Sequence, residues 1–214
     1  MPVKSKIFRL RRLIRHQLTA WNTGGEGIHS PTLFYLVRMI IYDENAYYAF
    51  GEIEQHRAAL RRSHPDVPQV SAKIGQLLFR LVNYLTETQR KPLTIVEAGH
   101  EQGMSTWYLS TPTENNVVVN CNEPEADCPK RVDLAYVAGE PTCEAMLRDC
   151  RRLLPSMTNH SIMVIGDIHQ TQESEQAWQA IQAMEQVTST LDLFDVGIVL
   201  FNKHYIRKHY RLRF

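Results

Sequence analysis

A glutamate and two glycines are spaced as in a loop that binds a nucleotide-type cofactor. Glu97, Gly99 and Gly103 follow a short apolar run with β-branched side chains, residues 93–96. Residues 104–109 contain no helix breaker, so a strand that turns sharply into a helix is expected here. Glycines at such a turn permit positive φ and let a ligand approach the main chain closely. The pattern indicates cofactor binding at the carboxyl end of a parallel strand.

An acidic residue further along the chain strengthens this prediction. Glu123 follows a second apolar run, residues 117–119, and lies about twenty residues after Gly103, where such folds place an acid for ribose hydroxyls. Together these signals favour a cofactor that carries adenosine. The spacing E-x-G-x-x-x-G differs from the dinucleotide pattern G-x-G-x-x-G, so a strand–glycine–helix turn without a ligand is the alternative interpretation.

The size and composition of the chain fit one domain with an appendage. Its 214 residues can bury a sizeable core. No apolar run approaches the ~20 residues that a membrane span needs, and no apolar segment follows the basic N-terminus, so a cytoplasmic location is expected. The four cysteines show no C-x-x-C spacing, which argues against a zinc site and favours reduced thiols: Cys121, Cys128, Cys143 and Cys150.

Positive charge is concentrated at the two ends of the chain. Residues 1–20 hold six basic side chains and residues 203–214 hold five, with no acid in either segment. The ends therefore carry +11, whereas the other 13 basic and 23 acidic side chains leave the middle at −10. Such asymmetry indicates an interaction surface. The partner could be an anionic molecule, a second copy of the chain in a homodimer, or the protein's own acidic surface, and the last is the simplest interpretation.

Helices are expected in the first third of the sequence. Residues 3–18 can form a basic helix with an apolar side, and a glycine-rich break follows at residues 23–27. Ser30 and Pro31 then supply an N-cap and a proline at the first helical position. A further short helix is expected within residues 53–60.

Strands and helices alternate in the remainder of the sequence. A helix capped by Ser71 precedes the central strand, and two later helices begin near Pro141 and Thr171. This alternation favours a largely parallel sheet covered on both faces. Besides the central strand at residues 94–98, strands are expected at residues 117–121, 132–138, 161–166 and 195–201.

The last residues depart from this alternation of strands and helices. Strands at residues 195–201 and 204–213 are separated by only Asn202 and Lys203, which allows an antiparallel hairpin but no crossover. We therefore expect the strand at 204–213 to be antiparallel in a sheet centred on residues 94–98. The strand at 117–121 should pair beside the central one and form an exposed edge.

The glycine loop and the reversed last strand resemble those of the class I S-adenosylmethionine-dependent methyltransferases. Residues 97–103 are similar to that family's first motif. Six other segments resemble one uncharacterised subgroup of the family: residues 27–31, 34–38, 47–50, 76–82, 165–169 and 203–207. The implied fold is a Rossmann-like methyltransferase sheet over residues 69–214, preceded by an N-terminal helical section over residues 1–68.

The resemblance implies that S-adenosylmethionine is the cofactor. The backbone between Gly99 and Gly103 would hold the methionine end of this cofactor, with Glu97 near its amino group. Asn122 or Glu123 would take the ribose hydroxyls. The methyl acceptor would be a small molecule or a cell-surface precursor.

The resemblance also places Asp167 and His169 next to the substrate, just after the fifth strand of the family. In-line attack of a substrate nucleophile on the cofactor's methyl group needs mainly proximity and alignment, so few dedicated side chains are required. Each residue also has a structural alternative, because aspartate often braces a strand–helix turn and a histidine often hydrogen-bonds within its loop.

Several positions depart from the family pattern. Only about ten residues, 123–132, separate the second strand from the next, where the family fits a helix, a strand and a helix. Ala138 and Gly166 stand where the subgroup has acidic residues, so one aspartate remains and no metal is expected. The second hypothesis is therefore a non-catalytic relative that retains a reduced sheet and binds a partner through its basic termini.

Overall fold

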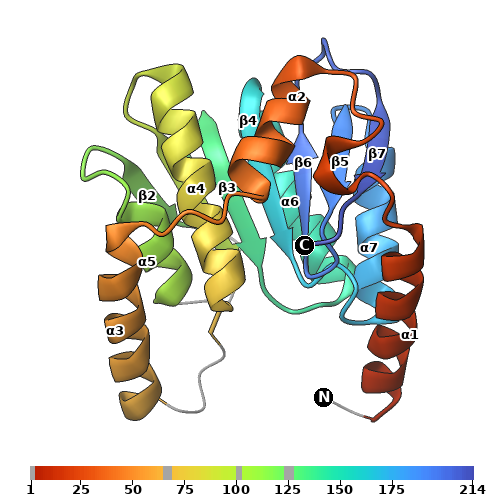
Figure 1. Cartoon of the computed structure of the whole chain (residues 1–214), viewed down its shortest axis with the longest axis horizontal. Coiled ribbons are helices and arrows are strands. Elements are labelled where there is room, and N and C mark those ends of the chain that lie inside the picture. The colour runs from red at the N-terminus through yellow and green to blue at the C-terminus, as the bar shows by residue number, and fades with distance from the viewer. Residues whose placement is uncertain (1–2, 65–68, 100–102, 123–127) are drawn as a thin grey trace.

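A computed structural model of the chain describes residues 3–64, 69–99, 103–122 and 128–214 (Figure 1). The first third is helical, as predicted, and both expected N-caps are confirmed. The hydroxyls of Ser30 and Ser71 each accept a hydrogen bond from the backbone N–H three residues later. The helices are α1 (Val3–Thr19), α2 (Pro31–Tyr35), which continues as a π-helical segment (Leu36–Ile41), α3 (Tyr48–Ser63) and α4 (Ala72–Gln89).

The described residues form a seven-stranded sheet in the order β2-β1-β3-β4-β6-β5-β7. Strands β2, β1, β3 and β4 are parallel to their neighbours in this set, whereas β6 is antiparallel to both β4 and β5. The predicted fold class, a mostly parallel Rossmann-like sheet with one reversed strand, is confirmed. The strands are β1 (Thr94–Gly99), β2 (Val117–Asn120), β3 (Val132–Ala138), β4 (Met157–Gly166), β5 (Ser189–Asp192), β6 (Val196–Leu200) and β7 (Lys208–Arg211).

Helices cover both faces of this sheet. Figure 1 shows α2 and α4 on one face and α6 (Cys143–Leu153) and α7 (Gln172–Ala183) on the other. Successive strand residues alternate between the two cores, as Ile95 and Val96 do, because side chains along a strand point to opposite faces. A short helix, α5 (Met104–Ser110), follows β1. No helix in the described part of the chain is long and apolar enough to cross a membrane.

The reversed strand is β6, and the prediction that residues 204–213 would supply it is wrong. β7 pairs parallel with β5, and β5 forms the hairpin with β6. The sequence did not reveal β5, because three of its four residues are polar. Those side chains are buried and find partners inside the protein: Ser189 bonds the Ile206 carbonyl, Thr190 bonds His209 and Asp192 bonds His169.

The position of β2 agrees with the prediction, whereas that of β1 does not. β2 pairs parallel with β1 and is the outermost strand on its side of the sheet formed by the described residues. β1 is therefore second from this edge, and β4 occupies the middle of the sheet. The connection between β2 and β3 is short, which accounts for the shift. All of it except residues 123–127 is described, and the described part contains no strand.

The N-terminal cap of α7 can be tested by substitution. Thr171 Oγ1 accepts the N–H of Ser174 at 3.0 Å, and Ser174 Oγ accepts the N–H of Thr171 at 3.0 Å. We expect Thr171→Ala to lower the free energy of unfolding by about 1–2 kcal/mol in urea titrations. Thr88→Ala removes a hydroxyl that bonds only backbone carbonyls in the last turn of α4, so it should change stability by less than about 0.5 kcal/mol. Equal losses in the two variants would contradict the cap.

Candidate functional site

The carboxyl ends of β1, β2, β3 and β4 meet at one edge of the sheet, at the bottom of Figure 1. This edge carries four of the five residues predicted to bind a cofactor: Glu97, Gly99, Gly103 and Asn122. The fifth, Glu123, lies outside the described residues, as do residues 100–102 between the two glycines. β1, the start of α5 and the end of β2 therefore form the candidate cofactor site.

Glu97 links the end of β1 to the first turn of α5. Its side chain is almost fully buried, and its two carboxylate oxygens accept hydrogen bonds from the hydroxyls of Ser105 and Thr106. Burial raises the pKa of Glu97, although both hydroxyl bonds act in the opposite direction. Each carboxylate oxygen has two lone pairs, so Glu97 can still accept a bond from a ligand amino group.

The two glycines have the positive φ values expected of them, 113° at Gly99 and 104° at Gly103. A Cβ on residue 99 would lie 1.5 Å from the carbonyl oxygen of Ala138, so the close approach of β3 alone requires glycine there. A Cβ on residue 103 would lie 3.3 Å from a methyl group of Leu60 in α3. The first glycine thus has a packing role that does not involve a ligand.

Asn122 presents a buried acceptor at the end of β2. Its Oδ1 atom has no hydrogen-bond partner among the described residues. The preceding Cys121 is held in place on both sides, because its carbonyl accepts a bond from Arg152 and its thiol contacts Cys128. Burial and this thiol contact raise the pKa of Cys121 to about 12. A buried amide oxygen without a partner favours a ligand with a hydroxyl or amino donor.

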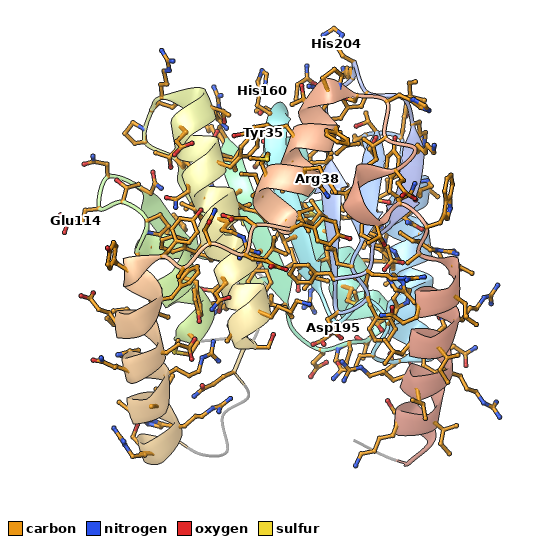
Figure 2. The ribbon with its side chains drawn as sticks, in the orientation of Figure 1. Tyr35, Arg38, Glu114, His160, Asp195 and His204 are labelled. Carbon is orange, nitrogen blue, oxygen red and sulfur yellow. The ribbon has the colours of Figure 1, made fainter. Side chains whose placement is uncertain are left out.

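Asp167 lies just past β4, in a left-handed conformation with φ 56°. Its N–H donates to the carbonyl of Asp195 at 2.7 Å, and Arg9 of α1 forms an ion pair with the Asp195 carboxylate at 2.5 Å. Figure 2 shows Asp195 near the lower edge of the sheet. Burial and the charge of Asp195 raise the pKa of Asp167, while Arg9 lowers it.

His169 is buried and engaged with other partners. Its Nε2 is 2.9 Å from Asp192 Oδ2 on β5, and its Nδ1 has no partner among the described residues. His16 of α1 places Nδ1 3.5 Å from the other Asp192 oxygen and Nε2 2.9 Å from the Leu212 carbonyl. The structure therefore joins His169 to a second histidine and an aspartate.

The sequence does not reveal this His16–His169–Asp192 cluster, because its members are far apart in the chain and share no motif. Burial alone would raise the pKa of Asp192, but the bond from His169 and the proximity of both imidazoles lower it. One ligand atom from each residue lies within 4.8 Å of the others, which is close enough to share a cation. The hydrogen bonds explain the arrangement without one, so the absence of a metal stays a prediction.

Comparison with known proteins identifies the fold. No protein-family model matches the sequence, and no curated protein matches it. Among solved structures, a candidate caffeoyl-CoA O-methyltransferase from Staphylococcus aureus matches 78% of this chain and 97% of its own, at 13% identity and a TM-score of 0.53. Cofactor-bound Rv0187 from MTB matches 78% of this chain and 95% of its own, at 11% identity and a TM-score of 0.51. The chain thus has the Rossmann-like fold of methyltransferases.

Proposed function

We propose that this protein is an S-adenosylmethionine-dependent methyltransferase whose cofactor binds at the carboxyl ends of β1 and β2. The observation that carries the proposal is the buried Oδ1 of Asn122, which has no partner among the described residues. The resemblance to class I methyltransferases implies that the cofactor's ribose hydroxyls would need an acceptor at this position. The methyltransferase fold and the cofactor-bound state of one structural neighbour support the binding of a cofactor.

The residues of this edge fit such a cofactor. Glu97 is fixed by Ser105 and Thr106, so its remaining lone pairs have a defined direction for the amino group of the methionine end. Asn122 would accept from the ribose. When bound, the cofactor supplies an electrophilic methyl group, and the chain contributes chiefly by holding the acceptor in line with it.

Asp167 is the residue that we propose faces the methyl acceptor. It follows β4 at the same edge of the sheet, and its raised pKa suits a carboxylate that accepts a proton from the attacking nucleophile. His169 has its Nε2 on Asp192, so we assign it a supporting role that fixes the loop between β4 and α7. The acceptor is a small molecule or a cell-surface precursor.

Calorimetric titration with S-adenosylmethionine tests the cofactor site. We expect weak binding, near ~1 mM, which corresponds to only about 4 kcal/mol. Asn122→Ala should lower the affinity by about tenfold, because it removes a buried acceptor worth roughly 1.4 kcal/mol. Asn120→Ala, which changes an exposed asparagine at the end of β2, two residues before Asn122, should leave the affinity unchanged. Equal affinities for wild type and Asn122→Ala would remove the site from the end of β2.

Two observations favour a second function, that of a non-catalytic binding protein. The hydrogen bonds of Glu97 and the packing of Gly99 on Ala138 give the motif residues structural roles that need no cofactor. If wild-type protein gives no heat of binding with either S-adenosylmethionine or S-adenosylhomocysteine, this second function replaces the first.

A further inference from the structure

One face of helix α1 packs against the rest of the protein. The Ser5 hydroxyl donates to the Gln170 carbonyl at 3.0 Å, and His16 bonds the Leu212 carbonyl. Arg9 pairs with Asp195, and Arg12 pairs with Glu175, each at 2.5 Å. The basic residues of this inner face thus lie on the protein's own acidic groups, which agrees with the simplest interpretation of the basic N-terminus.

The opposite face of α1 is apolar and exposed. Ile7, Leu10, Ile14 and Leu18 are 49%, 59%, 54% and 80% exposed. At 3.6 residues per turn, the four side chains fall within roughly 80° of the helix circumference. Trp21, which is 63% exposed, follows just beyond the end of the helix. Figure 1 shows α1 at the margin of the molecule.

Basic side chains border the stripe on both sides. Helical geometry puts Arg11 and Arg15 on one flank and Lys6 on the other, and all three are exposed. The C-terminal segment adds Arg211 and Arg213, which bond the Thr19 hydroxyl and the Gln17 carbonyl at the end of α1. No acidic residue occurs among residues 1–25. We call the four apolar residues with Lys6, Arg11 and Arg15 the outer face of α1.

We infer that the outer face of α1 lies on the surface of an anionic lipid bilayer. An exposed apolar stripe between rows of Lys and Arg is the pattern of helices that rest in a membrane interface with the apolar side about 5–10 Å deep. Anionic headgroups would complement the basic flanks, and the indole of Trp21 suits the boundary between headgroups and acyl chains. This inference is independent of the proposed methyltransferase activity.

Two other occupants of this face fit the chain less well. If two copies packed their stripes together, Lys6, Arg11 and Arg15 of both would face one another, and residues 1–25 offer no acid to pair with them. Nucleic acid would match the positive charge, since phosphates attract Lys and Arg. Its backbone, however, provides no apolar surface along which the four aliphatic side chains could be buried.

Binding to vesicles tests the inference. The full chain is added to phosphatidylcholine vesicles with or without phosphatidylglycerol, and binding is followed by co-sedimentation and by Trp21 fluorescence, with Trp21→Phe as the fluorescence control. We expect binding and a blue shift only with the anionic vesicles, and weaker binding as salt rises from 0.1 M to 1 M and the Debye length falls from ~10 Å to ~3 Å. No binding at low salt, or equal binding to neutral vesicles, overturns the inference.

Matched variants then test whether the outer face of α1 is the surface that binds the vesicles. Ile14→Glu should weaken vesicle binding by about tenfold or more, because it removes an apolar anchor and adds a negative charge. Ile206→Glu makes the same change at a more exposed position, outside α1, and should have a much smaller effect. Arg11→Gln and Arg15→Gln should each weaken binding by about fivefold.

The competing occupants give different results in the same assays. A concentration-dependent dimer that Ile14→Glu converts to monomer, without vesicle binding by the wild type, would assign the face to a second copy. Salt-sensitive binding to duplex DNA that Ile14→Glu leaves unchanged, again without vesicle binding, would assign it to nucleic acid. Either result overturns the lipid assignment.

Discussion

Gly99→Ala is expected to lower the free energy of unfolding by about 3–5 kcal/mol, because it combines a severe steric overlap with an unfavourable backbone conformation. The new Cβ would lie 1.5 Å from the Ala138 carbonyl oxygen, and Gly99 has a φ of 113°. Gly99 and Ala138 are also paired in register at the ends of β1 and β3, so relief would require separating two neighbouring strands of the sheet. Denaturant unfolding of the purified variant measures the loss.

Gly51→Ala is the control for this substitution. Gly51 is an exposed glycine within α3, and a Cβ there would meet no atom within 4 Å. Since alanine has the higher helix propensity, this variant should be more stable by up to about 1 kcal/mol. A loss below about 1 kcal/mol in Gly99→Ala would contradict the spacing of β1 and β3 described here. The prediction also explains why Asn122, and not Gly99, is the better probe of cofactor binding.

Asp192→Ala is expected to destabilise the protein by about 3–5 kcal/mol, because it removes the acceptor at the centre of a buried cluster. Asp192 accepts from His169 at 2.9 Å and from the N–H of Phe194 at 3.0 Å, and it lies 3.5 Å from His16. Without the carboxylate, His169 Nε2 and the N–H of Phe194 lose their acceptor, whereas His16 keeps its bond to the Leu212 carbonyl. Asp195→Ala makes the same change at a half-exposed ion pair and should cost less than about 1 kcal/mol.

The contribution of Asp192 should depend on pH in a defined direction. Its pKa in the folded protein is below the ordinary aspartate value, so the folded state favours the ionised form. The resulting stabilisation is present above the pKa of the unfolded chain, about 3.9, and is lost as the pH falls through the folded pKa. The difference in unfolding free energy between wild type and Asp192→Ala should therefore shrink below about pH 4. A difference that grows on acidification would contradict this assignment.

Local signals in the sequence predicted much of the fold. The caps at Ser30 and Ser71 are where the sequence placed them, and α7 begins next to Thr171 as expected, because capping depends on residues only three positions apart. The parallel strands were recognisable from continuous apolar runs. β5 was not, since Ser189, Thr190 and Asp192 are buried polar residues whose partners come from distant parts of the chain. Without β5, the reversed strand was assigned to the wrong residues.

The candidate site was predictable to a similar extent. Glu97, Gly99 and Gly103 belong to one short motif, so the sequence located them together. The engagement of His169 was not predictable, because Asp192 and His16 reach it only through the order of the strands and the docking of α1. The exposed stripe of α1 could be recognised as an apolar side, but the sequence did not show which face of the helix would pack.

The docking of α1 has a consequence for when the protein can complete its structure during synthesis. His16 bonds the carbonyl of Leu212, which lies 196 residues later in the chain. At about 5–20 residues per second, a ribosome needs roughly 10–40 s to make the intervening segment. The other inner-face residues of α1 must also wait for distant partners, because Ser5, Arg12 and Arg9 contact Gln170, Glu175 and Asp195. Helix α1, although translated before the sheet, is therefore among the last elements to acquire its native contacts.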